Sequence, residues 1–312
     1  MGSISVIIVS WNARDYLAKC LSSLSATGGS LIQEIIVVDN ASTDGSPAMV
    51  AQCFPDARLV CAGENLGFAR ANNLGATFAS GRYLALVNSD VVVHPDCLQR
   101  LTELLESDPS VGLAGPRVFG RDQKLQITRS QFPTVWNTAC HFLGLDRIFP
   151  GRRFFAGFDG RPEDHEHRAD AEVLSGCFWL IRRRAFDLIG GLDERFFFYA
   201  EDVDWCKRCK DAGWKAVYLP EATATHFGGG SSANAPVRYS IQMLRANLAY
   251  WEKHHGRSGR LAYLVLAFMQ HSLRLLARCA RRLVGRDADE AGRRQLAKHW
   301  ACVRWIITGK ES

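Results

Sequence analysis

The sequence predicts an α/β fold, with a parallel sheet covered by crossover helices and then a helical C-terminal segment. In the first 120 residues, short β-branched runs alternate with helical patterns, as in strands joined by crossover helices. The first run, Ile4–Ser10, is continuously apolar, which is typical of a strand buried on both faces. From Pro236 onward the pattern is helical, with breaks at Gly256–Gly259 and Gly285.

The individual elements of the first half follow from periodicity and from the residues that begin or end helices. Gly28-Gly29 ends the first helix, and we interpret Ser46-Pro47 as an N-cap followed by proline at the first helical position. The expected strands are 4–10, 34–39, 58–61, 83–87 and 111–114. The expected helices are about 15–26, 46–54, 68–80 and 95–106.

The middle of the chain lacks a clear period and is followed by renewed order. Residues 122–170 mix Pro, Gly, Arg and aromatic residues, and we interpret them as a long connection over a binding cleft. Order returns at 172–182, where the run Cys177-Phe-Trp-Leu-Ile predicts a strand. A helix at about 202–212 and a strand at 215–219 are expected next.

Composition indicates a folded protein whose basic character lies in its tail. The hydrophobic fraction of 47% and charged fraction of 22% exclude disorder as the main state. Residues 257–312 hold 12 Lys and Arg against 4 Asp and Glu, so the rest of the chain has a net charge of −2. A nucleic-acid face spread over the body is therefore not expected.

The N-terminus and the cysteines predict a cytosolic location. The N-terminus has no basic region or cleavage site, and no apolar run reaches the roughly 18 residues of a spanning helix. The ten cysteines have no framework spacing, which favours reduced thiols. The lone CxxC of Cys206 and Cys209 is interpreted as two thiols on a helix rather than as a zinc site.

Polar residues gather directly after the predicted strands, where ligands bind in sheets of this kind. The segment from Asp39 to Gly45 packs two carboxylates, an amide and two hydroxyls into a strand-to-helix turn. It is either a capping turn or a reader of a nucleotide base or ribose, because an aspartate can accept the imide N–H of uracil or thymine. Asn88 and Asp90 follow the fourth strand and supply oxygen ligands for Mg²⁺ or Mn²⁺.

Between these segments, a glycine and an arginine suggest an anion site. Gly67 would let backbone approach a ligand closely, and the helix N-terminus at Phe68 is a natural position for an anion. Arg70 could add a charge-assisted contact to phosphate. A glycine turn followed by a polar helix face is the equal alternative.

A later acidic pair has the features of a general base. Glu201 and Asp202 follow an aromatic run at a predicted helix start. Burial against aromatic surface raises the pKa of a carboxyl group, which suits a base, whereas capping is the alternative role. His226 follows a strand and is either a metal or diphosphate ligand or a satisfied loop histidine. The stretch from His165 to His167 is interpreted as a solvated loop.

Taken in order, these segments resemble family 2 glycosyltransferases, and most of all their bacterial rhamnosyltransferase-like branch. The resemblance covers about residues 3–232 and rests on SVIIVSWN, VDNASTDGS, ENLGFARANN, NSD, LSGCFWLIRR, GGLDERFFFYAEDVDWC and THFGGGSS. It implies a GT-A fold, a UDP- or dTDP-sugar donor, Mg²⁺ or Mn²⁺, and inversion at the anomeric carbon. It also implies a domain over 1–235, with a donor half of about 1–120 and an acceptor and catalytic half of about 121–235, before a helical basic extension over 236–312.

The resemblance also implies roles for particular residues. Asp202 is similar to the catalytic base, with Glu201 assisting or serving as the base itself, and His226 is similar to a histidine that meets the metal with Asp90. The residues implied in donor binding are Ser10, Asn12, Asp39, Asn40, Asp44, Asn65, Gly67, Arg70, Asn88 and Asp90. One departure is that Asn88 stands where the metal motif often has a first Asp, which leaves a single carboxylate and predicts modest metal affinity.

The C-terminal helix suggests a membrane partner. Arg274, Arg278, Arg281 and Arg282 share one arc of the helix, while Leu273, Leu276, Ala280, Leu283 and Val284 lie off it. A basic amphipathic helix of this kind docks on an anionic inner leaflet, which would suit a lipid-linked or cell-surface glycan as acceptor. The alternative is a helix that packs on the body with a solvated arginine stripe.

Three other functions compete with sugar transfer. A sugar-1-phosphate nucleotidyltransferase normally begins with a glycine-rich basic loop, which the turn Ser10-Trp-Asn-Ala-Arg14 lacks. A non-catalytic nucleotide-sugar-binding or scaffold protein is disfavoured by Asp39, Asp90 and Asp202. Nucleic-acid binding through the basic tail is the weakest alternative. The sequence identifies neither the sugar nor the acceptor, and rhamnose is favoured by the resemblance alone.

Overall fold

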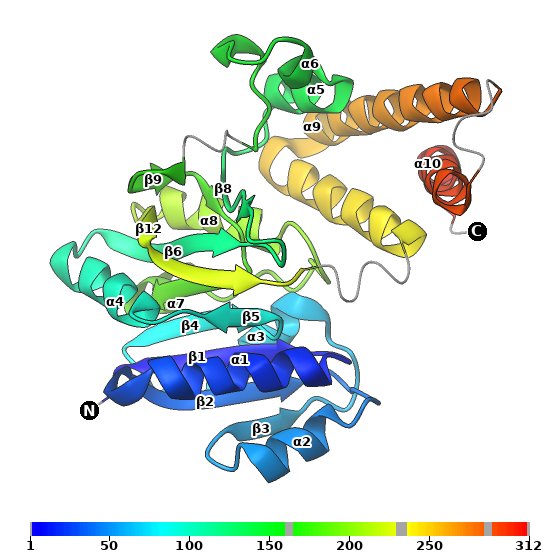
Figure 1. The fold of residues 1–312 in the computed structure, drawn as a ribbon. Coiled ribbons are helices and arrows are strands. Elements are labelled where there is room, and N and C mark those ends of the chain that lie inside the picture. The colour runs from blue at the N-terminus through cyan, green and yellow to red at the C-terminus, as the bar shows by residue number, and fades with distance from the viewer. Residues whose placement is uncertain (1, 160–164, 229–235, 284–288, 311–312) are drawn as a thin grey trace. The chain divides into compact units, whose positions relative to one another are not determined.

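The computed structural model describes residues 2–159, 165–228, 236–283 and 289–310 (Figure 1). These form two compact units, one of Met1–Phe132 with Asp159–Gly230 and the other of Pro133–Phe158 with Ser231–Ser312. The expected boundary near residue 235 lies close to the third and last transition between the units, at 230/231. Residues 133–158, however, were expected in the acceptor half and instead belong to the helical unit.

A mixed sheet forms the centre of the first unit (Figure 1). Its strand order is β3-β2-β1-β4-β11-β6-β12-β5, with β7 beside β6 and β9 beside β12. The strands are β1 (Ile4–Ser10), β2 (Ile32–Asp39), β3 (Arg58–Cys61), β4 (Tyr83–Asn88), β5 (Val91–Val93), β6 (Val111–Phe119), β7 (Leu125–Gln126), β9 (Ala169–Ala171), β11 (Phe178–Arg182) and β12 (Lys215–His226). A separate small sheet pairs β8 (Arg129–Ser130) with β10 (Val173–Leu174).

The sheet is parallel through its first four strands and mixed beyond them. Strands β1 to β4 are parallel, as predicted. Strand β11 then inserts antiparallel between β4 and β6, so β6 runs in the direction of β4 without touching it. The local apolar pattern of 111–114 gave no sign of this, because the intervening strand comes from much later in the chain.

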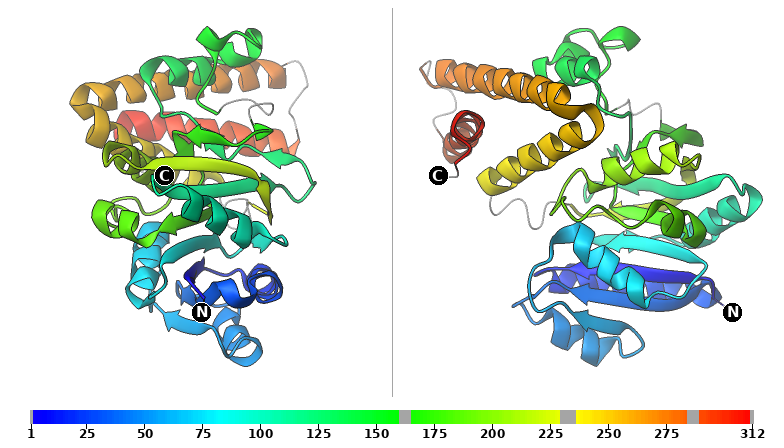
Figure 2. Two further views of the ribbon diagram at one scale, coloured as in Figure 1. Left: turned by 90° about the vertical axis from the view of Figure 1, so that its left-hand side faces the viewer. Right: turned by 180° about the vertical axis from the view of Figure 1, so that it is seen from behind.

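Helices cover both faces of the sheet (Figures 1 and 2). One core contains apolar residues of α1 (Arg14–Thr27), α2 (Ser46–Cys53) and α4 (Cys97–Ser107). The other contains those of α3 (Gly67–Phe78), α7 (Arg183–Ile189) and α8 (Glu201–Asp211). A short 3₁₀ turn, η1 (Gly29–Leu31), leads into β2. In β1, Val6 and Ile8 face the first core and Ile7 the second, as alternation in a doubly covered sheet requires.

The stretch 122–170 is more ordered than we expected. It contains α5 (Val135–Leu143), α6 (Leu145–Ile148) and a 3₁₀ turn, η2 (Arg153–Phe155). A capping box begins α5: the Thr134 hydroxyl accepts from the Asn137 N–H, and the Asn137 amide oxygen accepts from the Thr134 N–H. This capping box was not predicted from the sequence, because its fourth residue is Asn137 rather than the usual Glu or Gln.

The prediction of a solvated loop at His165 is also wrong. His165 is fully buried, and its ring lies 5.2 Å from that of Tyr218 in an edge-on arrangement. Its Nε2 accepts from the Arg129 N–H at 3.3 Å. Glu166 does remain exposed and pairs with Arg117 at 3.1 Å. The histidine therefore has a packing role.

The second unit is helical, as expected. It contains α9 (Pro236–Leu283) and α10 (Glu290–Thr308), and both α5 and α10 pack against α9. Gly256 has φ 66° and ψ −165°, so the predicted break in α9 is confirmed, whereas the break predicted at Gly285 lies outside the described residues. No described helix combines the length and apolar character that crossing a bilayer requires.

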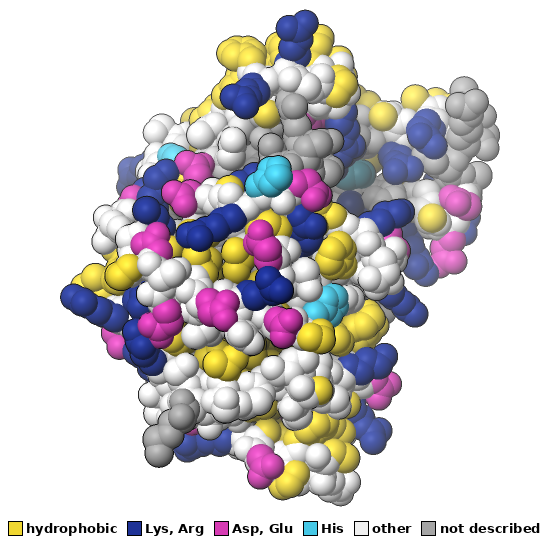
Figure 3. All heavy atoms as spheres, turned by 60° about the vertical axis from the view of Figure 1, so that its left-hand side comes forward, with side chains coloured by type: hydrophobic (Ala, Val, Ile, Leu, Met, Phe, Trp, Pro, Cys, Tyr) yellow, Lys and Arg dark blue, Asp and Glu magenta, His cyan; other side chains and the backbone are white. Residues whose placement is uncertain are grey.

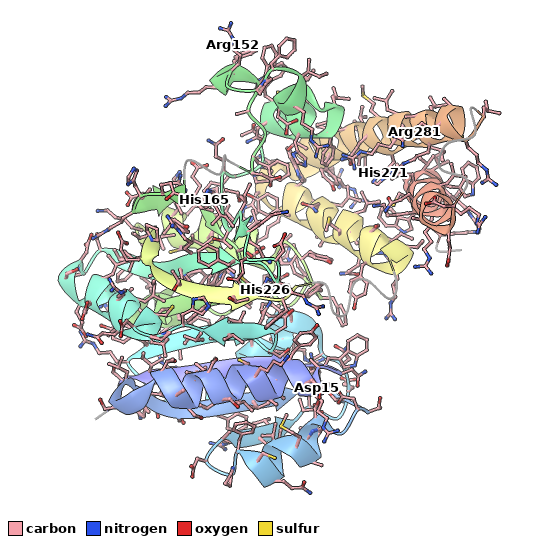
Figure 4. All side chains as sticks on the ribbon, in the orientation of Figure 1. Asp15, Arg152, His165, His226, His271 and Arg281 are labelled. Atoms are coloured by element: carbon pink, nitrogen blue, oxygen red, sulfur yellow. The ribbon has the colours of Figure 1, made fainter. Side chains whose placement is uncertain are left out.

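The faces of α9 differ from a fully solvated arginine stripe, which was the alternative to the expected membrane-docking face. Arg274 and Arg278 are half-buried, while Leu273, Leu276 and Leu283 are 52%, 66% and 89% exposed. The arginines share a helix face with His271, which is buried and lies 3.0 Å from His299 of α10 (Nδ1 to Nδ1; Figure 4). The part of this face that α10 covers thus lies at His271, Arg274 and Arg278, whereas Arg281 and Arg282 are exposed. Val284 lies outside the described residues.

Candidate functional site

The candidate site is built at one edge of the sheet in the first unit. Because β1, β2 and β4 are parallel, Ser10, Asp39 and Asn88 all end their strands at this edge. Strand β11 is antiparallel and therefore begins there: the Asn88 N–H donates to the Cys177 carbonyl at 3.0 Å. Strand β12 ends there too, with His226 paired to Val91 (Figure 4).

Side-chain hydrogen bonds join the loops after β1 and β2. The Asn12 N–H donates to the Ser42 hydroxyl at 2.9 Å, and the Asn12 amide oxygen accepts from the Thr43 N–H at 2.8 Å. Asn12 has φ 50°, a left-handed conformation that asparagine tolerates. Asn12, which was assigned to donor binding from the sequence, therefore holds the shape of this loop.

Asp44 is a capping residue. Its carboxylate accepts from the N–H groups of Arg14 and Ser46 and from the Ser46 hydroxyl. Partial burial alone would raise the pKa of Asp44, but these hydrogen bonds lower it overall. The N-cap predicted at Ser46 is wrong, because Gly45, at φ 82°, holds that position and Ser46 is the first helical residue.

Asp39 is buried and aimed into the site. Its Oδ2 accepts from the Ser42 N–H at 3.0 Å, and its Oδ1 has no hydrogen-bond partner. The hydroxyl of Ser10, on the neighbouring strand, is likewise buried without a partner. Two polar atoms at the ends of adjacent strands are thus left for a ligand.

Unpartnered buried polar atoms concentrate at this edge. Native proteins pair nearly all such atoms, so each exception needs an explanation. Among the described residues, four of the exceptions belong to the candidate site: Ser10 Oγ, Asp39 Oδ1, Asn88 Oδ1 and Glu201 Oε2. Three end parallel strands and the fourth begins α8. A polar ligand bound at this edge would satisfy them.

The turn before α3 is held by its own chain. The Asn40 side chain donates to the Gly67 carbonyl at 3.0 Å and accepts from the Leu66 N–H at 3.2 Å. Asn65 accepts from the Gly67 N–H at 3.0 Å. Asn40 and Asn65, both assigned to donor binding from the sequence, therefore position this turn.

The close approach predicted at Gly67 exists, but it is to the chain itself. A Cβ on Gly67 would lie 2.3 Å from the carbonyl oxygen of Phe197, and the Phe68 N–H donates to that oxygen at 2.7 Å. The Phe68 N–H, which we expected to bind an anion, therefore already donates to the Phe197 carbonyl. Arg70 is exposed and pairs with Glu64 at 3.7 Å, at the rim of the site.

Asp90, His226 and Gln126 form a connected group. The His226 Nε2 lies 3.2 Å from the Asp90 Oδ1. On the other side of the ring, the His226 Nδ1 lies 2.9 Å from the Gln126 Oε1, while the Gln126 amide donates to the His226 carbonyl at 2.9 Å. The Gln126 side chain thus orients the ring so that its Nε2 faces the Asp90 carboxylate, as in metal sites whose histidine is oriented by a second polar group.

These residues fit a divalent ion that is held partly by its substrate. The described residues contain no cluster of three or more His, Cys, Asp or Glu that could hold a metal alone. Asp90 and His226 supply two ligands, and the unpartnered Asn88 Oδ1 is a third oxygen close by in sequence. Mg²⁺-type sites commonly use one or two carboxylates, substrate phosphates and water, so the set is adequate only with a phosphate-bearing partner.

Two strained residues precede the acidic pair. Tyr199 and Ala200 have φ of 74° and 65°, a costly conformation for residues with a Cβ. They turn the chain so that α8 begins at Glu201. Behind the pair, Arg208 donates to the buried Asp204 at 2.8 Å and to the carbonyls of Ile189 and Gly191. Asp204 therefore anchors the helix.

The two carboxyl groups differ in their surroundings. Asp202 accepts from the Gly176 N–H at 3.1 Å and from the Val203 N–H at 2.8 Å. Burial raises the pKa of Asp202 and these two N–H groups limit the rise. Glu201 is 5% exposed, and burial together with the charge of Asp202 raises the pKa of Glu201 well above its ordinary value. Glu201, whose pKa is raised further above its ordinary value, is therefore the weaker acid of the two.

The Cys177 thiol interacts electrostatically with both Asp90 and Asp202. Burial raises the pKa of this thiol to about 12, a hydrogen bond with Ser175 opposes the rise, and the charges of Asp90 and Asp202 add to it. Both carboxylates therefore lie within electrostatic reach of one side chain. Gln126 and Gly176 were not predicted as site residues. Gln126 comes from the aperiodic stretch, and Gly176 contributes only backbone.

The fold and this site define a glycosyltransferase of the GT-A type. The chain belongs to glycosyl transferase family 2, whose family model matches residues 5–190. The N-acetylglucosaminyl-diphospho-decaprenol L-rhamnosyltransferase of Mycobacterium tuberculosis is 29% identical over 264 residues, covering 81% of this chain and 85% of that protein. The dTDP-rhamnosyl transferase of Shigella flexneri is 21% identical over 268 residues, covering 81% of each.

A solved structure shows the same fold. The mannosyltransferase of Pyrobaculum calidifontis, in complex with GDP-Man and Mn²⁺, matches with a TM-score of 0.58 and 18% identity. The match covers 99% of this chain and 88% of that chain. The predicted fold class, a GT-A type α/β fold with a mainly helical C-terminal region, is thus confirmed.

The Gly67–Phe197 contact gives a test of how the site is positioned. We expect Gly67→Ala to lose stability and most transferase activity, because the added Cβ displaces the backbone just before the acidic pair. Gly63→Ala is the matched control: its φ of 79° imposes similar strain, but nothing lies within 4 Å of the added Cβ. The control should lose only about 1–2 kcal/mol in urea unfolding and keep its activity. Equal activities in the two variants would contradict the positioning role.

Proposed function

We propose that the protein is an inverting, metal-dependent transferase that moves a sugar from a dTDP- or UDP-sugar to an acceptor hydroxyl. The observation that supports this best is the set of unpartnered atoms on Ser10, Asp39, Asn88 and Glu201 at one edge of the sheet. A nucleotide sugar offers the donors and acceptors that such a set lacks. Rhamnose is the favoured sugar, because two relatives have rhamnosyl transfer in their names.

For the donor, we assign Asp39 to the base. Its Oδ1 is buried and has no hydrogen-bond partner, so it can accept from the imide N–H of thymine or uracil. Ser10 offers a hydroxyl on the adjacent strand. Asn12, Asn40, Asp44, Asn65 and Gly67 hold the surrounding loops, and Arg70 lies at the rim.

For the metal, we assign Asp90 and His226, with Asn88 beside them. A bound Mg²⁺ or Mn²⁺ supplies Lewis-acid stabilisation of the charge on the leaving diphosphate. The chain's own contribution is orientation: Gln126 holds the imidazole so that its Nε2 faces the Asp90 carboxylate. With a single carboxylate among these residues, we expect modest affinity in the absence of nucleotide.

For the chemical step, we assign Asp202 as the base. It takes the proton of the acceptor hydroxyl while the hydroxyl oxygen attacks the anomeric carbon and the nucleoside diphosphate leaves from the opposite face, which inverts the configuration. The Gly176 and Val203 N–H groups fix its two oxygens, so little reorganisation is needed. Protonated Glu201 avoids a second buried negative charge next to the base.

For the acceptor, we propose a lipid-linked or cell-surface glycan reached from the cytoplasmic side of a membrane. The Mycobacterium tuberculosis relative is named for a diphospho-decaprenol acceptor. All ten cysteines are free thiols, which suits a reducing compartment. The helical unit exposes Leu273, Leu276 and Leu283 of α9, which suits a lipid surface.

Ligand binding tests the donor site. A thermal-shift panel of dTDP, UDP and GDP, each with and without Mn²⁺, should show metal-dependent stabilisation by dTDP or UDP. Stabilisation reaches roughly 2.7 kcal/mol at a hundredfold excess over Kd. Asp39→Ala and Asp90→Ala should abolish it, while Asp56→Ala, an exposed carboxylate outside the site, should not. No shift with any nucleotide would favour the non-catalytic binding or scaffold alternative.

Kinetics separate the two carboxyl groups. We expect Asp202→Asn to lower kcat by about 10²- to 10⁴-fold, the usual contribution of a general base, with donor binding nearly intact. Glu201→Gln mimics the protonated acid and should keep most of the activity. Because the base must be deprotonated, kcat/KM should rise as pH rises through the raised pKa of Asp202. The reverse ranking of the two variants would make Glu201 the base.

A further inference from the structure

A cluster of exposed apolar side chains lies in the helical unit, outside the catalytic site. We name residues 135–155, which contain α5, α6 and η2, the aromatic tip. Its large apolar side chains are unusually open to solvent. Their exposed fractions are 51% for Val135, 45% for Trp136, 63% for Ile148, 43% for Phe149 and 68% for Phe154. Contiguous apolar surface of this kind marks an interaction site.

The rings of the aromatic tip hold one another in place. The centroid of Trp136 lies 4.9 Å from that of Phe154, and the centroid of Phe155 lies 4.6 Å from that of Phe149. The Trp136 Nε1–H donates to the Phe154 carbonyl at 2.6 Å, so the polar atom of the indole is satisfied within the tip. The apolar surface is therefore preformed and presents few unmet hydrogen-bond groups.

Three arginines of the same segment have no acidic partner among the described residues. Arg147, Arg152 and Arg153 are exposed, and no ion pair is formed by any of them within the described part of the chain. Asp146 is the one acidic residue in 133–158, and it pairs with His141 at 3.2 Å. Arg152 lies at the outer end of the tip (Figure 4). Figure 3 shows apolar and basic side chains side by side there.

We propose that the aromatic tip docks on an anionic phospholipid surface, with its rings in the headgroup region and its arginines on lipid phosphates. Aromatic rings are enriched at that depth, and uncompensated arginines are attracted by the negative surface potential. A single weak membrane-binding element gives only marginal attachment of a protein to a bilayer, whereas inserted apolar side chains together with a basic patch give stable attachment. A second copy of the chain fits less well, because two tips would bring like charges together.

This inference deepens the proposed function, since it supplies the surface on which a lipid-linked acceptor would be met. The docking itself does not depend on the sugar or the nucleotide. It also differs from the expectation drawn from the sequence, which assigned membrane contact to the arginine stripe of α9. Arg274 and Arg278 of that stripe are half-buried and Arg281 and Arg282 exposed, whereas all three arginines of the tip are exposed.

Vesicle co-sedimentation of the full chain tests the docking. The vesicles would contain either phosphatidylcholine alone or phosphatidylcholine with about one third phosphatidylglycerol. We expect binding to the anionic vesicles and little to the neutral ones. The double variants Phe149→Ser/Phe154→Ser and Arg152→Glu/Arg153→Glu should each weaken binding about tenfold or more.

Matched controls come from the first unit. Leu188 is 68% exposed, as Phe154 is, and Arg100 and Arg184 are exposed arginines. Leu188→Ser and Arg100→Glu/Arg184→Glu change surface hydrophobicity and net charge in the same way as the tip variants, and should bind anionic vesicles like the unaltered chain. Circular dichroism would establish that all variants are folded.

The outcomes separate the docking from the proposed function. Tip variants that lose vesicle binding yet retain metal-dependent nucleotide stabilisation would support the proposal. Tip variants that bind as tightly as the controls would overturn it. Absence of binding to either vesicle would also overturn it, and would leave an acidic protein as the occupant of the tip. Vesicle binding without any nucleotide stabilisation would contradict the transferase assignment alone.

Discussion

Strand β11 is the constraint on which the rest of the site depends. It pairs antiparallel with β4 on one side and β6 on the other, and the Asn88 N–H donates to the Cys177 carbonyl where β4 ends. This pairing brings Gly176 to the edge at which the parallel strands end. Gly176 in turn donates to Asp202, so this carboxylate is held against the sheet that positions Asp39 and Asn88.

The structure concentrates its energetic costs at this edge. Tyr199 and Ala200 adopt left-handed backbone conformations, four polar atoms are buried without partners, and two adjacent carboxyl groups are desolvated. The compensation lies further out, in the contacts that anchor α8 and α3: Arg208 binds Asp204, and Asn73 binds the backbone of Leu192. A rigid frame around strained, unsatisfied groups is what preorganised catalysis requires.

The features carried by local patterns were predictable from the sequence. Strands β1 to β4 were predictable because each is a short apolar run. The positions of Asp39 and Asn88 at the ends of parallel strands follow from the same pattern. Pairing between distant segments left no such trace, and hence the orientation of β11 and the contact between Gln126 and His226 were missed. Helical periodicity placed Arg274 and Arg278 on one face, but only the packing of α10 decides that this face is the buried one.

The most direct test of the account is a crystal structure of the protein with dTDP and Mn²⁺. The account predicts that the thymine imide N–H donates to the Asp39 Oδ1, and that Mn²⁺ bridges the diphosphate to Asp90 and His226. Asp202 should face the open side of the diphosphate. A nucleotide bound elsewhere, or a metal held without Asp90 and His226, would contradict the claim that this edge of the sheet is the donor site.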